Sequence, residues 1–469
     1  MVFSALTDGI TRSVESAGAA LSGSFFEPTL RIGVTGLSRA GKTVFITGLV
    51  ANLLNRGRMP QLQAAGRIEA AYLQPQPDLT LPRFDYENHL AALTGDDPHW
   101  PQSTRAISEL RLSLRSRPSG LFAAFKGPQT LHLDIVDYPG EWLLDLTLLD
   151  KSYAEWSEAT LARIARRPEA ATFMATARAE DGALRLDEPR AKSLAASFTA
   201  YLQDARANGW SDCTPGRFLL PGDLAGSPVL TFAPLPMPAL TPRACLWREM
   251  QRRYNAYKSR VVQPFFRDHF AKVDRQVVLV DVLGAIHKGP AATEDLRRTM
   301  AEVLTAFRPG RNGWLASLLG GKRVERILFA ATKADHLHHS QHPALTAIMA
   351  AMLAEAKTRA DFAGADTAAM SLAALRCTVE ETALRAGISL DAVRGRLLDT
   401  GKQAIMYPGQ LPTDPARLLS PAREGAARWL DADYALMGFA PARISLKPGD
   451  GPPHIRLDRA AEFLFGDRL

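Results

Sequence analysis

The sequence predicts an α/β fold, in which a mostly parallel six-stranded sheet flanked by helices carries a large, mainly helical insertion. Two observations lead to this prediction. Short apolar runs typical of buried strands alternate with segments of helical periodicity. Residues 143–274 then separate the third strand from the fourth, although a compact α/β crossover needs far fewer residues. A chain of 469 residues also exceeds what one hydrophobic core usually fills.

Each predicted strand is an apolar or alternating run, and the last of them is the weakest. The strands are expected at residues 30–35, 107–114, 131–137, 276–282, 324–331 and 370–377. Helical periodicity follows the first strand at residues 42–54, and within the insertion it marks residues 153–166, 191–207 and 246–270.

These patterns divide the chain into five parts. We expect an N-terminal amphipathic helix, two halves of one core, the insertion between them, and a C-terminal extension packed on the core. The N-terminal helix is expected to pack on the protein's own body, with docking to a membrane surface or to a partner as the alternative. In this order the parts are residues 1–28, 29–142, 143–274, 275–400 and 401–469.

Composition excludes several classes of protein. Hydrophobic residues at 46% and charged residues at 22% are ordinary for a globular chain. The net charge of +7 is a thin excess, so we expect no nucleic-acid partner. Cys213, Cys245 and Cys377 are far apart and predict neither disulfides nor a cysteine zinc site. Because no apolar run is long enough to span a bilayer, we expect a cytoplasmic protein that is not membrane-spanning.

A glycine-rich loop follows the first predicted strand and precedes a predicted helix. Its pattern, G-x-x-x-x-G-K-[ST], lets backbone N–H groups surround a phosphate at the positive end of that helix. Lys42 is expected to bridge the β- and γ-phosphates, and the Thr43 hydroxyl to bind Mg²⁺. The predicted nucleotide-binding residues here are Gly36, Leu37, Ser38, Arg39, Ala40, Gly41, Lys42, Thr43 and Val44. The loop predicts a P-loop NTPase.

Two further segments are expected to reach the phosphates. The third strand ends in D-x-x-G, which places Asp137 near Mg²⁺ and the Gly140 N–H near the γ-phosphate, with Asp134 the weaker metal candidate. Thr104, just before the second strand, is expected to complete the Mg²⁺ shell, with Ser103 as its substitute. The predicted metal ligands are therefore Thr43, Asp137 and Thr104.

The fifth strand leads into Thr332-Lys333-Ala334-Asp335, which resembles the N/T-K-x-D element that recognises guanine in G proteins. Asp335 can accept hydrogen bonds from the guanine N1–H and exocyclic amine, and the Lys333 stem can lie along the base. Threonine at position 332 loses the amide of the commoner asparagine, so ATP stays an alternative. Cys377 and Thr378, after the sixth strand, are expected to give further contacts to the base.

Catalysis is the least determined part of the prediction. Glu141 follows Gly140 where Ras-like proteins carry a glutamine, and a carboxylate there is repelled by a γ-phosphate unless a cation or proton intervenes. We therefore expect slow turnover or another residue that positions water. Arg39 and Arg105 are the nearest basic candidates for stabilising the transferring phosphoryl group. The histidine cluster at residues 336–342 predicts a polar helix entrance rather than a metal site.

Long strings of this sequence resemble the YcjX family of bacterial P-loop NTPases. The resemblance rests on residues 33–43, 137–142, 220–226, 275–281 and 453–458, which span almost the whole chain. It implies a stress-associated, cytoplasmic nucleotide-binding protein with a G-protein-like core, a helical insertion and an integral-membrane partner. Members of this family have been described both as ATPases and as GTPases.

The leading hypothesis is therefore a GTPase switch that uses GTP, GDP and Mg²⁺. In this hypothesis the loops of Thr104 and Gly140 close on the γ-phosphate, and the insertion that begins beside Trp142 relays their release. A protein partner at the membrane and peripheral association with the inner membrane are compatible with it. An ATPase, or a nucleotide-stabilised scaffold with little turnover, are the alternatives.

Overall fold

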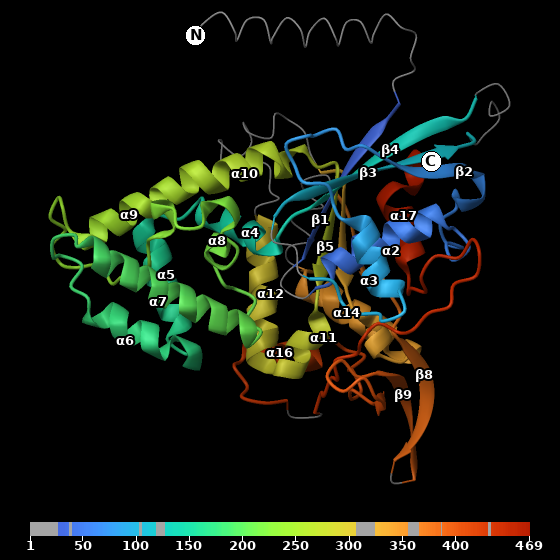
Figure 1. Cartoon of the computed structure of the whole chain (residues 1–469). Coiled ribbons are helices and arrows are strands. Elements are labelled where there is room, and N and C mark those ends of the chain that lie inside the picture. Colours follow the sequence, from blue (N-terminus) through green and yellow to red (C-terminus); the bar gives the residue numbers. More distant parts are fainter. Residues whose placement is uncertain are drawn as a thin grey trace, which may run out of the picture.

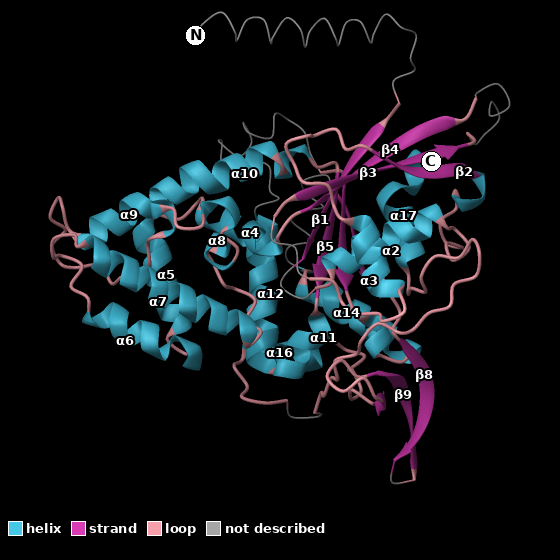
Figure 2. Cartoon of the chain, in the orientation of Figure 1, coloured by secondary structure: helices cyan, strands magenta, loops and turns pink. Residues whose placement is uncertain are grey.

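The computed structural model describes residues 27–36, 40–102, 106–118, 127–305, 324–354, 365–385, 387–429 and 433–469. The main sheet has seven strands: β1 (Thr29–Gly36), β2 (Ile68–Gln74), β3 (Ser108–Ser116), β4 (Gln129–Asp137), β5 (Arg275–Val280), β6 (Arg326–Ala331) and β7 (Asp366–Ser371). Their order is β2-β3-β4-β1-β5-β6-β7. Figures 1 and 2 show the sheet between the helices, with β1 to β5 labelled. The five strands from β4 to β7 in this order are parallel, and β2 and β3 extend the sheet antiparallel.

The central strands are apolar on both faces because helices cover both. In β5, Val277 and Leu279 belong to one hydrophobic core, whereas Val278 and Val280 belong to the other. The first core is covered by α2 (Lys42–Leu54), α3 (Tyr86–Thr94) and α17 (Leu457–Phe465). The second is covered by α11 (Val282–Lys288), α12 (Pro290–Thr305), α14 (His342–Met352) and the insertion.

A helical unit lies between β4 and β5 and extends to one side of the sheet (Figure 1). Its helices are α4 (Gly140–Leu144), α5 (Tyr153–Ile164), α6 (Ala171–Ala179), α7 (Glu188–Ala207), α8 (Gly216–Leu219), α9 (Leu246–Tyr257) and α10 (Gln263–Asp268). Buried aromatic rings fill its centre, among them Trp156 and Tyr254, which stack with centroids 5.0 Å apart. These rings belong to the same core as Val278 and Val280 of β5, so the unit is continuous with the sheet's interior.

The C-terminal part of the chain folds back on the sheet. A second, antiparallel sheet contains β8 (Thr378–Arg385), β9 (Ile388–Arg396) and β10 (Gln403–Met406), and α16 (Ala416–Arg423) follows it. The last helix, α17, is held at the start of β5, because the buried Arg275 binds Asp467 at 2.9 Å and the Leu464 carbonyl at 3.2 Å. Within the described residues, no helix is long and apolar enough to cross a membrane.

The predicted α/β fold class is confirmed, and the strands differ from the prediction in two places. The sheet has a seventh strand, β2, at its edge; this strand is half-exposed and therefore lacks a strong apolar pattern. The last strand of the sheet ends at Ser371, whereas the prediction extended it to Cys377. The Leu372 N–H still donates to the Ala331 carbonyl of β6, but after it the chain leaves β6, and Ala373 pairs instead with Ile455. The predicted N-terminal helix lies outside the described residues, except for residues 27 and 28 of that range.

Candidate nucleotide-binding site

The loop between β1 and α2 depends on its two outer glycines. Gly41, immediately before α2, has a φ of 81°, a left-handed conformation that glycine adopts without strain. A Cβ atom on Gly36 would lie 2.9 Å from the Leu279 carbonyl oxygen, so no side chain fits where β1 passes β5. The middle of the loop, residues 37–39, lies outside the described residues. The two glycines thus meet the backbone requirements of the predicted phosphate loop.

Lys42 and Thr43 open α2 beside this loop. The Lys42 Nζ donates a hydrogen bond to the Gly36 carbonyl at 3.4 Å, so the ammonium group lies back over the loop. Thr43 is buried, and Asp137 is fully buried at the end of β4. β4 pairs in parallel with β1, which brings Asp137 to the same edge of the sheet as the loop. A hydroxyl and a carboxylate are donors that suit Mg²⁺, so these two residues fit the predicted metal site.

Asp134, the weaker metal candidate, has a different partner. Its carboxylate accepts hydrogen bonds from Arg111 Nε at 2.6 Å and Nη2 at 2.8 Å. Successive side chains of a strand point to opposite faces, so Asp134 and Asp137 lie on opposite faces of β4. The bidentate pair engages Asp134 away from the phosphate loop. Of the other predicted metal-site residues, Thr104 and its substitute Ser103 lie outside the described residues, as does Arg105.

The helix α4 begins at Gly140, the glycine of the D-x-x-G segment, and Glu141 is its second residue. Glu141 is buried, and its Oε1 lies 2.7 Å from Nη2 of Arg206, in the last turn of α7. The sequence could not predict this ion pair, because Arg206 lies 65 positions after Glu141 in the chain. A cation therefore balances the buried Glu141 carboxylate, and the helical unit supplies it.

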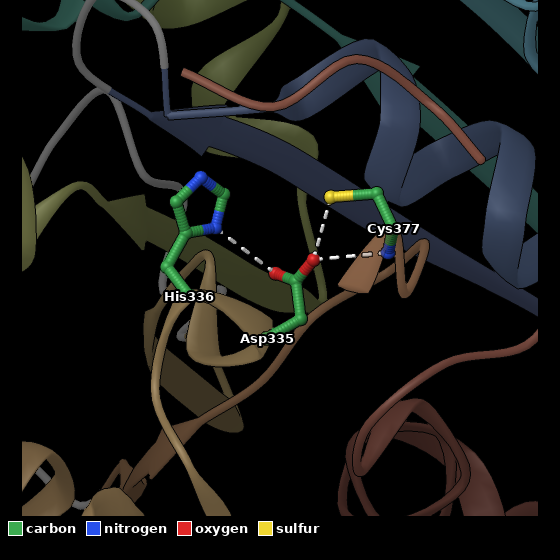
Figure 3. Close-up of side chains that lie close together, drawn as sticks. All are labelled: Asp335, His336 and Cys377. Atoms are coloured by element: carbon green, nitrogen blue, oxygen red, sulfur yellow. Dashed lines mark hydrogen bonds and ion pairs between the residues drawn. The ribbon is translucent and has the colours of Figure 1, made fainter. Parts of the chain in front are cut away.

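Asp335 lies in a short turn, η9 (Ala334–His336), after β6 (Figure 3). Its Oδ2 accepts hydrogen bonds from the Cys377 backbone N–H at 3.0 Å and from the Cys377 thiol at 2.8 Å, and His336 Nδ1 lies 3.4 Å from its Oδ1. Burial alone raises the pKa of Asp335, but the bonds from His336 and Cys377 outweigh burial and lower this pKa below its ordinary value. Asp335 is therefore an ionised acceptor at neutral pH.

Cys377 and Thr378 hold the turn that carries Asp335. Burial, together with the Asp335 carboxylate, raises the pKa of the Cys377 thiol well above its ordinary value, so the thiol keeps its proton and donates a hydrogen bond to Asp335. The Thr378 hydroxyl donates to the Asp335 carbonyl oxygen. Both residues therefore orient Asp335 in this structure, whereas the sequence predicted contacts with the base itself.

Thr332 and Lys333 connect the same turn to β5. The Thr332 backbone N–H and hydroxyl both donate to the Val280 carbonyl, at 2.9 and 3.3 Å. Lys333 has a φ of 60°, and its ammonium group forms an ion pair with Asp281. Threonine thus compensates in part for the missing asparagine, because its hydroxyl secures the turn to the neighbouring strand.

A pocket of about 360 Å³ joins the phosphate loop to the Asp335 turn, a size within the usual range of small-molecule sites. Residues 40–45 line it, as do Thr332, Lys333 and Asp335. His336, residues 372–375 and Cys377 also line it, together with residues whose role the sequence did not indicate: Trp100, Pro101, Gln102, Leu398, Gly438 and Phe439. The Trp100 Nε1–H donates to the Phe439 carbonyl at 2.8 Å, which joins the loop before β3 to the C-terminal part.

The other segments of the helical unit pack around α4. The Trp142 indole N–H donates to the Leu220 carbonyl at 3.1 Å, and the Arg217 guanidinium lies 3.2 Å from the centre of a Trp142 ring. A Cβ atom on Gly216 would lie 2.1 Å from the Glu141 carbonyl oxygen, so the backbones of the two segments touch. Asp145, just beyond α4, accepts a hydrogen bond from the Gly216 N–H at 2.7 Å. The segment after Gly140 is thus part of the interior of the helical unit.

The histidine cluster after Asp335 divides into two groups. His342 is buried, and its Nε2 is bonded to the Ala334 carbonyl at 2.8 Å, so it helps to shape the turn. His338 and His339 both face Glu380 of β8, with ring-to-carboxylate distances of 3.7 and 2.8 Å. Glu380 lies beyond the reach of a local sequence pattern, and it joins the helix entrance to the second sheet.

The fold and this site define a P-loop protein of the G-protein-like class: a G-x-x-x-x-G-K-T loop follows a central parallel strand, and the D-x-x-G and T-K-x-D segments end β4 and β6. The chain belongs to the YcjX-like family, DUF463, whose model matches residues 30–469. A relative in Escherichia coli (strain K12), named Ras-like GTPase YcjX, is 38% identical over 457 residues, which cover 94% of this chain and 96% of the relative. A relative of the same name in Shewanella oneidensis is 37% identical over 472 residues and 94% of both chains.

Proposed function

We propose that this protein binds GTP with Mg²⁺, hydrolyses it to GDP and phosphate, and acts as a conformational switch. The observation that carries the proposal is that the buried Asp335 lines the same pocket as Lys42 and Thr43. The relatives are named as Ras-like GTPases, which agrees with this assignment.

Guanine is the base that an ionised Asp335 favours. Each carboxylate oxygen can accept more than one hydrogen bond, so the bonds from Cys377 leave capacity for the guanine N1–H and exocyclic amine. Adenine presents a lone pair at N1, which would face the carboxylate and repel it. Because the pKa of Asp335 is lowered, the acceptor persists throughout the neutral range.

The phosphates are assigned to the part of the pocket that residues 40–45 line. We assign the β- and γ-phosphates to the loop backbone and the Lys42 ammonium, with Arg39 as a further cation near the transferring group. Thr43, Asp137 and Thr104 would hold Mg²⁺, which supplies positive charge between the phosphates when it is bound. Glu141 is engaged with Arg206 in this structure, so slow intrinsic hydrolysis remains our expectation.

The switch depends on the step from Gly140 into α4. The Gly140 N–H is assigned to the γ-phosphate, and the next residues are buried in the helical unit through Trp142, Gly216 and Asp145. A shift of Gly140 when the γ-phosphate leaves must therefore displace or strain these contacts, because packed interiors do not deform freely. We infer that the helical unit reads the nucleotide state.

One experiment separates this function from its alternatives: titration of the purified protein with GTP, GDP and ATP in Mg²⁺, followed by phosphate release. We expect GTP to bind more tightly than ATP, and Lys42→Ala and Thr43→Ala to abolish release above background. Lys447→Ala, which changes an exposed lysine far from the loop, is the control and should not alter release. Tighter binding of ATP would favour an ATPase, and release that the loop variants do not lower would favour a scaffold.

The cellular setting follows only from the family resemblance. A role in a bacterial stress response, a cytoplasmic location at the periphery of the inner membrane, and a protein partner there stay predictions.

A further inference from the structure

Glu141 follows Gly140, the residue whose N–H is assigned to the γ-phosphate, but its side chain faces a different cavity. Its carboxylate does not line the pocket that joins Lys42 to Asp335; among the described residues, Glu141 lines a second cavity of about 330 Å³. This seam cavity lies between α4, the end of α7, α11 and the segment of residues 436–438. The side chain of Glu141 is 6% exposed and that of its partner Arg206 is 26% exposed, so the pair sits at the inner wall of the seam.

The seam cavity adjoins the nucleotide pocket. Lys333, His336 and Gly438 line both spaces, so one thin wall separates them. Among the other charged groups at the seam, Lys333 and Asp281 pair with each other, and the Lys288 side chain lies against Gly209. Arg206 is the cation that contacts the Glu141 carboxylate, at 2.7 Å.

We propose that Arg206 is a positioning residue, which holds the Glu141 carboxylate in the seam cavity and away from the γ-phosphate. This role rests on the proposed function, because it requires that a γ-phosphate bind at Gly140. Glu141 is one residue from Gly140, so a carboxylate released from Arg206 lies within reach of that phosphate. Two like charges at this separation in a partly buried site repel each other strongly.

The proposal makes GTP binding depend on a residue of the helical unit. Arg206 belongs to the last turn of α7, whereas Glu141 belongs to α4. A movement of α7 that separates the pair therefore weakens binding of the triphosphate, and binding of the triphosphate favours the arrangement in which the pair is closed. This reciprocity is required of any two linked equilibria. GDP has no γ-phosphate, so separation of the Arg206–Glu141 pair should not change the affinity for GDP.

A double-mutant cycle with two nucleotides tests the proposal. The dissociation constants of GDP and of a non-hydrolysable GTP analogue are measured for the wild type, Arg206→Ala, Glu141→Gln and the double variant. For like charges roughly 8 Å apart in a partly buried site, we expect Arg206→Ala to weaken the binding of the GTP analogue on the order of thirty-fold. GDP binding should stay within about twofold, and adding Glu141→Gln should restore most of the affinity for the analogue.

Two further variants keep the test specific. Arg206→Lys preserves the charge and should retain most of the affinity for the analogue. Arg190→Ala removes an exposed arginine from the same helix, where it pairs with Glu180, and should change neither constant. Equal losses for GDP and the analogue would show that Arg206 is only structural, and a loss that Glu141→Gln does not rescue would overturn the proposal.

Failure of the proposed function gives a different result. If the wild type binds adenine nucleotides instead, the same cycle is run with ADP and a non-hydrolysable ATP analogue. The charge argument concerns the γ-phosphate and not the base, so the same selective loss and rescue are expected. Selective loss and rescue with the adenine pair would refute guanine specificity while supporting the role of Arg206.

Discussion

Substitution of Asp335 by asparagine tests the assignment of the base most directly. In the structure the Asp335 Oδ2 accepts from the Cys377 N–H at 3.0 Å, and an asparagine carbonyl oxygen can keep that bond. The turn should therefore keep its shape while the charge is lost. A hydrogen bond to a charged group contributes about 1.5–3 kcal/mol, so weakening two such bonds to guanine should cost on the order of 3 kcal/mol. That loss corresponds to a roughly hundred-fold weaker affinity for GDP.

The same substitution should also change the preferred base. Xanthine carries a carbonyl oxygen where guanine carries its exocyclic amine, and the new amide N–H₂ of Asn can donate to that oxygen. We expect isothermal titration to show xanthosine diphosphate binding more tightly than GDP to the Asp335→Asn variant. Asp399→Asn, at an exposed turn, is the control and should leave both affinities unchanged. A loss of GDP affinity below about fivefold, with no gain for xanthosine diphosphate, would refute the assignment.

Two further predictions concern the enclosure of α4. Burial raises the pKa of Asp145 to about 7, so the protonated carboxyl is favoured in the folded state, and the folding stability that it contributes is lost as the pH rises from about 4 to 7. The free energy of unfolding of the wild type relative to Asp145→Asn should fall by on the order of 4 kcal/mol across that window in urea titrations, and a constant difference would contradict the buried assignment. Gly216→Ala should force the segment at Gly216 away from α4 and lower the melting temperature, whereas Gly66→Ala, whose Cβ meets nothing within 4 Å, should not; equal melting temperatures would show that the contact is dispensable.

The central sheet could be predicted because its strands are apolar on both faces and end in chemically distinctive segments. The loop from Gly36 to Thr43 and the turn at Asp335 are contiguous in sequence, so their residue types indicate their chemistry directly. The strand β2 and the second sheet lack such a signal, since half-exposed strands mix polar and apolar residues. The run after Ser371 misled the prediction, because an apolar run indicates burial and not strand pairing.

The other half of the site could not be predicted, since it depends on contacts between distant segments. Trp100 meets Phe439 across 339 positions, and Arg206 meets Glu141 from a separate helix. A solvated arginine and a paired arginine have the same local sequence signal, and only the packing of α7 against α4 distinguishes them. The sequence therefore predicts the chemistry of each short motif but not the contacts between segments that are distant in the chain.

The wall formed by Phe439 has a consequence for the newly made protein. The phosphate loop leaves the ribosome early, but the pocket remains open on one side until residues 436–439 have been synthesised and have reached Trp100. The α17 helix, which contacts Arg275, comes later still. The phosphate loop is therefore synthesised long before the residues that complete the pocket. Under the proposed function, we expect tight nucleotide binding to require the completed fold.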